Sequence, residues 1–400
     1  MTRRTTTLGV LAGGAALALA LAGCTGSGSA SGTGVAATST STSTSDALDQ
    51  ALAELVAMPG GPPGVISIVQ IGDERTVHTA GVAEVGTDTP PAADDFMRIA
   101  SVAKAFSGAT ALALVDKGEL SLDDTIGERL PDLPAAWADV TLRELLNHTS
   151  GLPDFTESPG LAAAAGASLD VSPAPEELLT FAYDEPLNFP PGSEYRYSNS
   201  DNIAVGLMIQ AATGKPYTDS LQELVLDPLG LTSTSLPVGV EMPTPTFHGY
   251  DLEAGEAPED VTELVAAGWA WASGGVVSTP ADLNTFIRGY VGGQLFGAET
   301  QAEQTDLFIP GGESGPPGPG ENSASLSLFR YVTPCGTVYG HTGNTPGYTQ
   351  FAVASPDGTR SATMSMSLAR NLSGTGQDLE VLHALQRAEA TAICAALDAS

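Results

Sequence analysis

Segments typical of β-strands stand at both ends of this chain, and the long stretch between them is mostly helical. Apolar runs and alternations predict strands near the start and again near the end, at 65–71, 75–82, 326–332, 336–339, 348–354 and 361–367. Helical patterns separated by Pro- and Gly-rich loops fill most of the middle. One sheet must therefore take strands from both ends of the chain. This predicts an α/β fold, with the α/β part at 46–100 and 266–400 and an inserted helical part at 101–265.

The N-terminus has the composition of an export signal. Two arginines, Arg3 and Arg4, precede an apolar run over 8–22 that is too short and too rich in Ala and Gly for a convincing membrane span. The run ends in Leu21-Ala22-Gly23-Cys24, which resembles the lipobox of bacterial lipoproteins. The resemblance implies a signal peptide at 1–23 and a lipid on Cys24. The alternative is an ordinary secretory signal followed by a chance cysteine.

Residues 24–45 are rich in Ser, Thr and Gly and have no apolar pattern that could form a core. Such composition is typical of a flexible tether, although an O-glycosylated stalk would read the same way. Together with the lipid, it predicts one folded domain over 46–400, held on the outer face of the bacterial cell membrane. We expect this domain to be a monomer.

Charge and cysteine usage narrow the function further. The formal net charge is −32, which argues against nucleic acid or an acidic polymer as a partner. With Cys24 assigned to lipid, Cys335 and Cys394 are predicted to form a disulfide outside the cytoplasm; two buried free thiols are the alternative. The five histidines lack the spacing of metal ligands, so we expect neither a metal nor a cofactor.

Ser101 and Lys104 are the first candidates for chemistry. Residues at i and i+3 share one face of a helix, so the hydroxyl and the amine would meet. An amine whose pKa is lowered by burial or nearby cations can take the serine's proton and activate it as a nucleophile. The alternative is a capped helix that carries an exposed lysine.

Two later stretches add polar groups. Tyr197 and Asn199 lie in a loop that opens a helix, where the phenol could enter a cleft and the amide could both donate and accept hydrogen bonds. The alternative is that Tyr197 is a packing aromatic residue and Asn199 a helix cap.

The run from His341 through Thr342 and Gly343 to Asn344 lies on a predicted edge strand. Its glycine would let a substrate lie along the strand, with a backbone amide facing an oxyanion. His341 could equally be a hydrogen-bonded structural residue.

Taken together and in this order, Ser-x-x-Lys, Tyr-x-Asn and His-Thr-Gly resemble the serine penicillin-recognising enzymes, in particular the D-alanyl-D-alanine carboxypeptidase and class C β-lactamase branch. The run at 269–275, which begins at Trp269, supports the resemblance. It implies a β-lactamase/transpeptidase-like fold, with an antiparallel sheet flanked by helices and an inserted all-α domain.

The resemblance also implies a role for each residue. Ser101 is the nucleophile, Lys104 accepts its proton and Tyr197 relays a proton to the leaving amine. The remaining positions bind substrate: Asn199 holds Lys104 and the substrate amide, the amides of Ser101 and Asn344 form the oxyanion hole, and substrate contacts come from His341, Thr342, Gly343 and Trp269.

The expected activity is that of a D-alanyl-D-alanine carboxypeptidase acting on peptidoglycan stem peptides and acylated by penicillin. A class C-type β-lactamase or a small-ester esterase is the alternative, and a non-catalytic binding module is a third.

One departure from the carboxypeptidase pattern bears on this choice. Where related carboxypeptidases place an arginine to bind the terminal carboxylate, this chain has Phe329, with Arg330 beside it. Neighbours in a strand face opposite sides, so Arg330 would point away.

The Gly-rich stretch 311–321 is predicted to be a mobile, solvent-facing loop.

Overall fold

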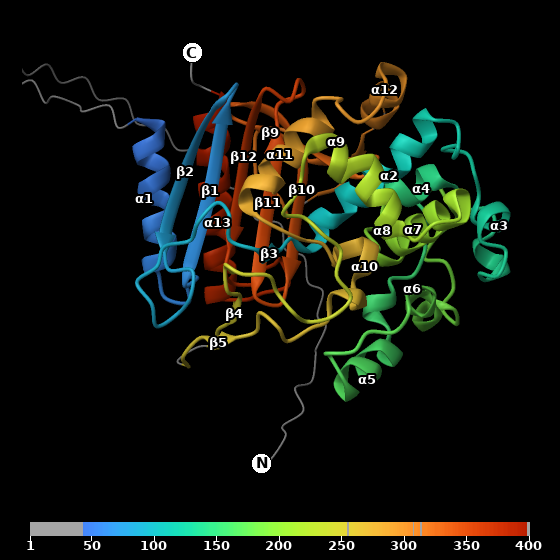
Figure 1. Ribbon diagram of the computed structural model, residues 1–400, viewed down its shortest axis with the longest axis horizontal. Helices are drawn as coiled ribbons and strands as arrows, with labels where there is room; N and C mark the ends of the chain where they lie inside the picture. Colours follow the sequence, from blue (N-terminus) through green and yellow to red (C-terminus); the bar gives the residue numbers. More distant parts are fainter. Residues whose placement is uncertain (1–42, 254–255, 307, 313, 398–400) are drawn as a thin grey trace, which may run out of the picture. The chain divides into compact units, whose positions relative to one another are not determined.

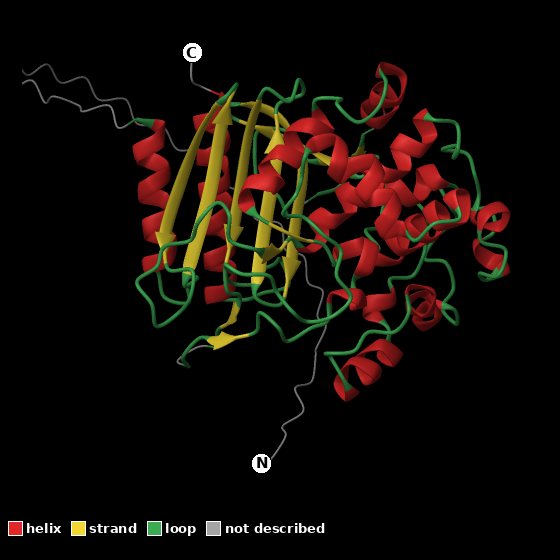
Figure 2. Cartoon of the chain, in the orientation of Figure 1, coloured by secondary structure: helices red, strands yellow, loops and turns green. Residues whose placement is uncertain are grey.

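The computed structural model describes residues 43–397 apart from 254–255, 307 and 313. The predicted signal peptide, Cys24 and nearly all of the tether therefore lie outside the described residues. Within the described chain, an eight-stranded antiparallel sheet has the order β2-β1-β12-β11-β10-β9-β8-β7 (Figures 1 and 2). Its strands are β1 Gly64–Ile71, β2 Glu74–Gly81, β7 Ile309–Pro310, β8 Ser323–Ser325, β9 Leu328–Thr333, β10 Gly336–Thr345, β11 Tyr348–Ala354 and β12 Arg360–Met366.

The N-terminal hairpin β1–β2 joins the sheet next to β12, the last strand of the chain. This confirms that the sheet takes its strands from both ends of the sequence. The helices are α1 Thr44–Ala57, α2 Ala103–Asp116, α3 Ile126–Arg129, α4 Leu142–Leu146, α5 Pro159–Ala167, α6 Pro175–Leu178, α7 Asn199–Thr213, α8 Tyr217–Leu221, α9 Asp227–Leu229, α10 Trp271–Gly274, α11 Pro280–Val291, α12 Ala298–Asp306 and α13 Gln377–Leu397.

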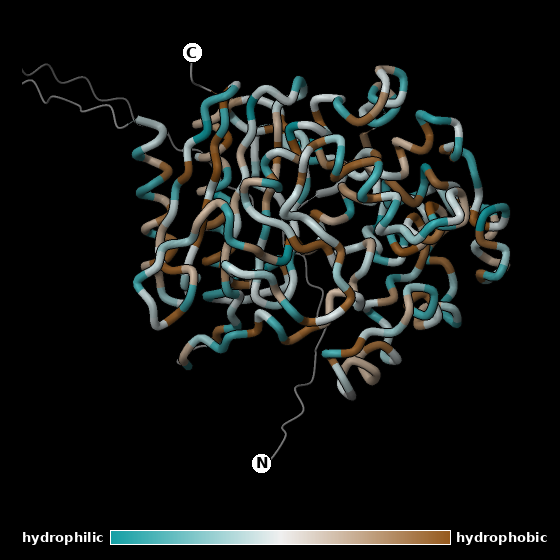
Figure 3. The backbone as a smooth tube through the Cα atoms, viewed as in Figure 1, coloured by the Kyte–Doolittle hydropathy of each residue, from teal (hydrophilic) through white to brown (hydrophobic). Residues whose placement is uncertain are grey.

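Helices cover both faces of the sheet. α1 and α13 contact each other and pack against β1, β2 and β12, whereas α11 packs against β11 and β12 from the helical side (Figure 1). A strand covered on both faces buries consecutive residues rather than alternate ones, and every residue of β11 is buried. In β11, Phe351 packs into the core beneath α13 and Ala352 into the core shared with the helical part. Hydrophobic stretches of the backbone, coloured brown, occur both in the sheet and in the helical part (Figure 3).

Helix α1 begins two residues before the predicted start at Asp46. Ser43 Oγ accepts a hydrogen bond from the Asp46 amide at 3.1 Å, and the Asp46 carboxylate accepts one from the Ser43 amide at 3.4 Å. This capping box fixes the first turn, so the helix extends into the predicted tether. Leu48, Leu52 and Leu55 then face the core beneath α1 and α13.

A two-stranded ladder closes the base of the inserted helical part. Strand β3 (Met97–Arg98) enters it, strand β6 (Val277–Ser278) leaves it, and the two pair antiparallel. A second short ladder joins β4 (Tyr250–Asp251) to β5 (Glu259–Asp260). Inside, α2 contacts α7 and α10 and is buried over almost its whole length. Gly206 on α7 allows α10 to pack closely against α7, because a Cβ there would lie 2.6 Å from the Trp271 ring.

A disulfide joins the sheet to the C-terminal helix α13. Cys335, in the turn between β9 and β10, forms a disulfide with Cys394 of α13, as the sequence predicts. No helix among the residues described here is long and apolar enough to cross a membrane.

The prediction of a solvent-facing loop at 311–321 is wrong for its first half. Gly311, Gly312 and Gly315 are buried, and a Cβ at these positions would collide with the rings of Tyr195, Phe329 and Tyr331 respectively. Because they lack side chains, the segment lies flat on aromatic side chains beside β9. Glycine content predicted exposure, but here it permits close packing.

Candidate active site

Ser101 lies at the start of the helical part and lines a cavity of about 700 Å³. It sits in a single 3₁₀ turn, Ala100–Val102, that leads directly into α2. Ala100 before it has a positive φ of 50°, an uncommon conformation for a residue with a side chain. The turn presents the half-buried hydroxyl of Ser101 to the cavity at the N-terminal end of α2.

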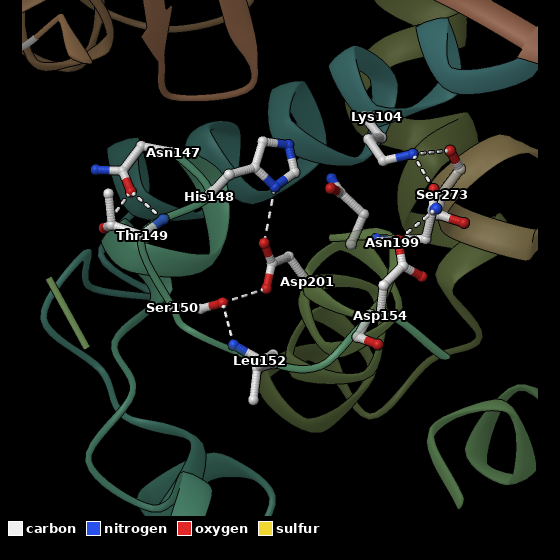
Figure 4. Close-up of polar contacts among 12 residues, drawn as sticks. Lys104, Asn147, His148, Thr149, Ser150, Leu152, Asp154, Asn199, Asp201 and Ser273 are labelled. Atoms are coloured by element: carbon white, nitrogen blue, oxygen red, sulfur yellow. Dashed lines mark hydrogen bonds and ion pairs between the residues drawn. The ribbon is translucent and has the colours of Figure 1, made fainter. Parts of the chain in front are cut away.

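Lys104 lies one turn further on and has no solvent exposure. Its Nζ atom is 3.2 Å from Ser101 Oγ. The same atom is 2.7 Å from Asn199 Oδ1 and 2.8 Å from the Ser273 carbonyl (Figure 4). The last two atoms can only accept, so they take two N–H groups of the amine. In the neutral amine, the remaining lone pair then faces the Ser101 hydroxyl.

Burial lowers the pKa of Lys104 from its ordinary 10.5 to about 7, against the opposing pull of Asp154 and Asp201. A charged amine without solvent is destabilised, and the nearby acidic groups only partly compensate. A large fraction of Lys104 is therefore neutral near pH 7. This position and this lowered pKa are those that the predicted role of Lys104, general base for Ser101, requires.

Tyr197 joins the same pair of residues. Its hydroxyl is hydrogen-bonded with Ser101, and its ring centre lies 4.8 Å from Lys104 Nζ. Burial raises the pKa of Tyr197 well above its ordinary value, so the phenol keeps its proton at neutral pH. This separates the two roles: Lys104 can accept the serine proton, and Tyr197 can donate one.

Strand β10 forms the opposite wall. Gly343 packs against the Ser101 turn so closely that a Cβ would lie 2.6 Å from the Ile99 carbonyl oxygen and 3.0 Å from the Ser101 amide. β10 pairs with β9 only as far as Gly340, so the stretch from His341 to Thr345 is an open strand edge on that side. The predicted edge strand is therefore found in the half of β10 that lines the cavity.

His341 is buried and stacks obliquely on Phe329, with ring centres 4.8 Å apart. Its Nδ1 atom donates to the Thr342 carbonyl at 2.5 Å. Burial holds the pKa of His341 down at about 3, so the ring is neutral at physiological pH. Thr342 Oγ1 lies 2.6 Å from Ser314 Oγ, which links the strand to the Gly-rich segment.

Most of the residues predicted to form the site line the cavity, but not all of them do. Ser101, Tyr197, Asn199 and the four residues from His341 to Asn344 all line it. Trp269 does not: it packs, partly buried, against the larger core. Arg330 also lies outside the lining, with its guanidinium 4.3 Å from the Phe308 ring centre, while Phe329 faces the cavity. The predicted orientation of Arg330 is thus confirmed.

Sequence reasoning missed a buried polar network behind Tyr197. His148 Nδ1 lies 2.7 Å from Asp201 Oδ2, and Ser150 donates to Asp201 Oδ1 at 2.5 Å (Figure 4). The His148 and Tyr197 rings are 4.5 Å apart. Burial lowers the pKa of His148 to about 3 and raises that of Asp201 well above its ordinary value, which favours an uncharged pair.

A sequence model of the beta-lactamase family matches residues 48–387. The chain belongs to this family. The likeness to serine penicillin-recognising enzymes is therefore confirmed, and the protein is a serine hydrolase of the beta-lactamase fold. Among the described residues, no group of His, Cys, Asp or Glu is arranged to hold a metal ion.

Relatives in this beta-lactamase family carry different activities in their names. The chain is 30% identical over 274 residues to the D-alanyl-D-alanine-carboxypeptidase/endopeptidase AmpH of Escherichia coli, covering 66% of each chain, or about two thirds of the length of AmpH. A D-stereospecific amidohydrolase from Streptomyces sp. superposes with a TM-score of 0.73 at 28% identity, covering 84% of this chain and 97% of that one. The D-amino acid amidase from Ochrobactrum anthropi gives 0.75 at 26%, with 88% and 98% covered.

Proposed function

We propose that the protein is a serine peptidase that cleaves the amide bond following a D-alanyl residue in peptides of the peptidoglycan stem type. The observation that carries this proposal is the fully buried Lys104 amine, whose Nζ atom lies 3.2 Å from Ser101 Oγ. Its N–H groups donate to two other acceptors, Asn199 Oδ1 and the Ser273 carbonyl. The D-stereospecific names of AmpH, the amidohydrolase and the amidase support the choice of substrate.

The reaction follows from these positions. Neutral Lys104 takes the proton of the Ser101 hydroxyl while Ser101 Oγ attacks the D-alanyl carbonyl. The backbone amides of Ser101 and Asn344 bind the oxyanion that forms. Tyr197 donates its proton to the leaving nitrogen, the C–N bond breaks, and the Lys104 ammonium then gives its proton to the Tyr197 phenolate, which restores the phenol and the neutral amine. Water then attacks the acyl-enzyme with the same groups in reverse roles, which releases the acid and restores Ser101.

The predicted carboxypeptidase is the form of this activity in which the leaving group is a terminal D-alanine. Phe329 occupies the place where an arginine would bind its carboxylate, and Arg330 is turned away. We therefore propose that release of terminal D-alanine is not the preferred reaction, and that other D-alanyl amides are better substrates. Hydrolysis of penicillin or small esters is the second candidate, which the open edge of β10 would also accommodate.

We also propose that the domain works outside the cytoplasm, anchored through Cys24. The Cys335–Cys394 disulfide supports an oxidising compartment, because such bonds rarely persist in the cytosol. Incorporation of a fatty acid in the expressing bacterium, compared between the natural chain and Cys24→Ala, tests the anchor.

The activity is tested by following intact mass over time after addition of benzylpenicillin, and by measuring hydrolysis of diacyl-D-Ala amides, diacyl-D-Ala-D-Ala and the L-alanyl counterparts. We expect a stable adduct that is absent in Ser101→Ala, and hydrolysis of the D-series only. Rapid turnover of penicillin without D-peptide hydrolysis would favour the β-lactamase instead. Absence of both acylation and hydrolysis would make the proposal wrong.

A further inference from the structure

Glu389 on α13 is a buried acid that the mechanism does not use. The residue is 2% exposed, and its Oε2 atom has no hydrogen-bond partner among the described residues. It nevertheless lines the same cavity as Ser101. A buried carboxyl group without a partner is unfavourable, so a group that reaches it through the cavity and satisfies it would be bound strongly.

The position of Glu389 within the cavity follows from its neighbours. Gln386, one turn earlier on α13, donates to the carbonyls of Ser314 and Gly315 at 3.3 and 3.1 Å. Ser314 in turn contacts Thr342 of β10. Glu389 is therefore near the Thr342 and Phe329 side of the cavity, where the resemblance expects the end of the substrate beyond the scissile bond.

The charges around the cavity favour a cation there. Its acidic lining residues are Asp154, Glu157 and Glu389, of which Glu157 is already paired with Arg196 at 3.0 Å. The one arginine or lysine among the described lining residues is Arg370. Arg370 Nε already lies 3.1 Å from the Asp378 carboxylate. No described cation is paired with Glu389, so a cationic ligand can take that place beside the carboxyl group.

The titratable groups of Tyr331 and His341, on this side of the cavity, do not supply a charge. On β9, Tyr331 has a pKa raised well above its ordinary value by burial and by Glu389 itself. On β10, His341 is held neutral by burial. Desolvation alone raises the pKa of Glu389 to about 8, and an ammonium placed beside it would bring that pKa down again and ionise the carboxyl group.

We infer that Glu389 binds a substrate ammonium group on the leaving-group side of the scissile bond. The substrate class is a D-alanyl amide or peptide whose following residue carries a primary amine in place of a free terminal carboxylate. This inference rests on the proposed function for its placement relative to Ser101. It also explains how the cavity can lack an arginine from β9 and still select a leaving group.

Binding is measured first, without turnover, by calorimetry on the Ser101→Ala protein. The probes are N-acetyl-D-alanyl amides of 1,4-diaminobutane and 1,5-diaminopentane, each compared with the alkylamide in which methyl replaces the terminal ammonium. We expect the ammonium ligand to bind at least tenfold more tightly in one of the two pairs. Equal affinities within both pairs, or no binding of any probe, would overturn the inference.

Variants then assign the preference to one carboxyl group. Glu389→Gln keeps the shape and polarity of the side chain without its charge, and should reduce the ratio of affinities to about one while leaving the methyl-terminated ligand unchanged. Glu380→Gln, on an exposed turn of the same helix, is the matched control and should preserve the ratio. Retention of the preference in Glu389→Gln would overturn the inference. Failure of hydrolysis or penicillin acylation in the unaltered protein would contradict only the proposed function, because the binding assay does not need Ser101.

Discussion

Asp154 Oδ2 accepts two hydrogen bonds from Asn199, one from its backbone amide at 3.0 Å and one from its side-chain amide at 2.9 Å. A carboxylate cannot donate, so Nδ2 of Asn199 must face Asp154 and Oδ1 must face Lys104. Asp154 thus orients the acceptor that positions the general base. In this positioning role it acts through Asn199.

Substitutions at Asp154 should therefore separate positioning from charge. Asp154→Ala leaves Asn199 free to rotate, and we expect kcat/KM to fall about 10- to 100-fold, the range for misplaced catalytic groups. Asp154→Asn retains an acceptor but removes a charge that raises the pKa of Lys104. Its rate at the optimum should fall less, and its acid limb should move to lower pH. Unshifted pH profiles with equal losses in both variants would contradict this role.

The activity should depend on pH through the lowered pKa of Lys104, at about 7. The neutral amine is the reactive form, and its fraction increases as pH rises. We expect kcat/KM to fall about tenfold per unit well below pH 7 and to level off above it. Lys104→Arg should be inactive throughout, because a guanidinium remains charged at any of these pH values. Rates of acylation by penicillin, measured from pH 5 to 9, check this, and a flat profile below 7 would contradict it.

The parts of the fold that could be predicted depend on local patterns. Apolar periodicity located the strand at 64–71 and the strands of the C-terminal half, since these segments are mostly buried whatever their partners. The second hairpin strand at 74–81 is mostly exposed, and the turn at Gly72-Asp73 indicates it instead. Ser101 and Lys104 were accessible to sequence reasoning because their contact lies within one helical turn. Tyr197 and the His341 strand required the resemblance, because no local pattern brings residues about 95 and 240 positions away to Ser101.

The residues that were missed share a different property: their roles depend on burial in three dimensions. Glu389 reads as one more acid on an amphipathic helix, and Asp201 as an acid in the first turn of α7. Only the packing of α13 on the sheet and of α7 on the His148 segment deprives them of water. The glycines at 311–315 were misjudged for the same reason, since sequence does not show whether a glycine faces solvent or an aromatic ring.

Gly343 should be intolerant of a side chain. A Cβ would approach the Ile99 carbonyl to 2.6 Å and the Ser101 amide to 3.0 Å, which forces β10 away from the nucleophile. For Gly343→Ala we expect at least a tenfold loss of kcat/KM and a decrease of about 1–3 kcal/mol in the free energy of unfolding. Gly166→Ala in α5, where a Cβ meets nothing within 4 Å, is the control and should be neutral or stabilising. Normal activity in Gly343→Ala would contradict the close approach.

The His148–Asp201 pair should behave as a neutral network that supports Tyr197. Asp201→Ala leaves His148 and Ser150 without their shared partner, and we expect about 2–3 kcal/mol lower stability in urea unfolding. Asp201→Asn can still accept from Ser150 and contact His148, so it should lose markedly less if burial keeps the natural side chain uncharged. Its pH profile should retain the limb set by Lys104, moved to lower pH to the extent that Asp201 is ionised, because an ionised Asp201 raises the pKa of Lys104. If Asp201→Asn is as unstable as Asp201→Ala and its acid limb moves strongly, the pair is ionised in the folded protein, and the charge on Asp201 rather than its hydrogen bonds tunes the general base.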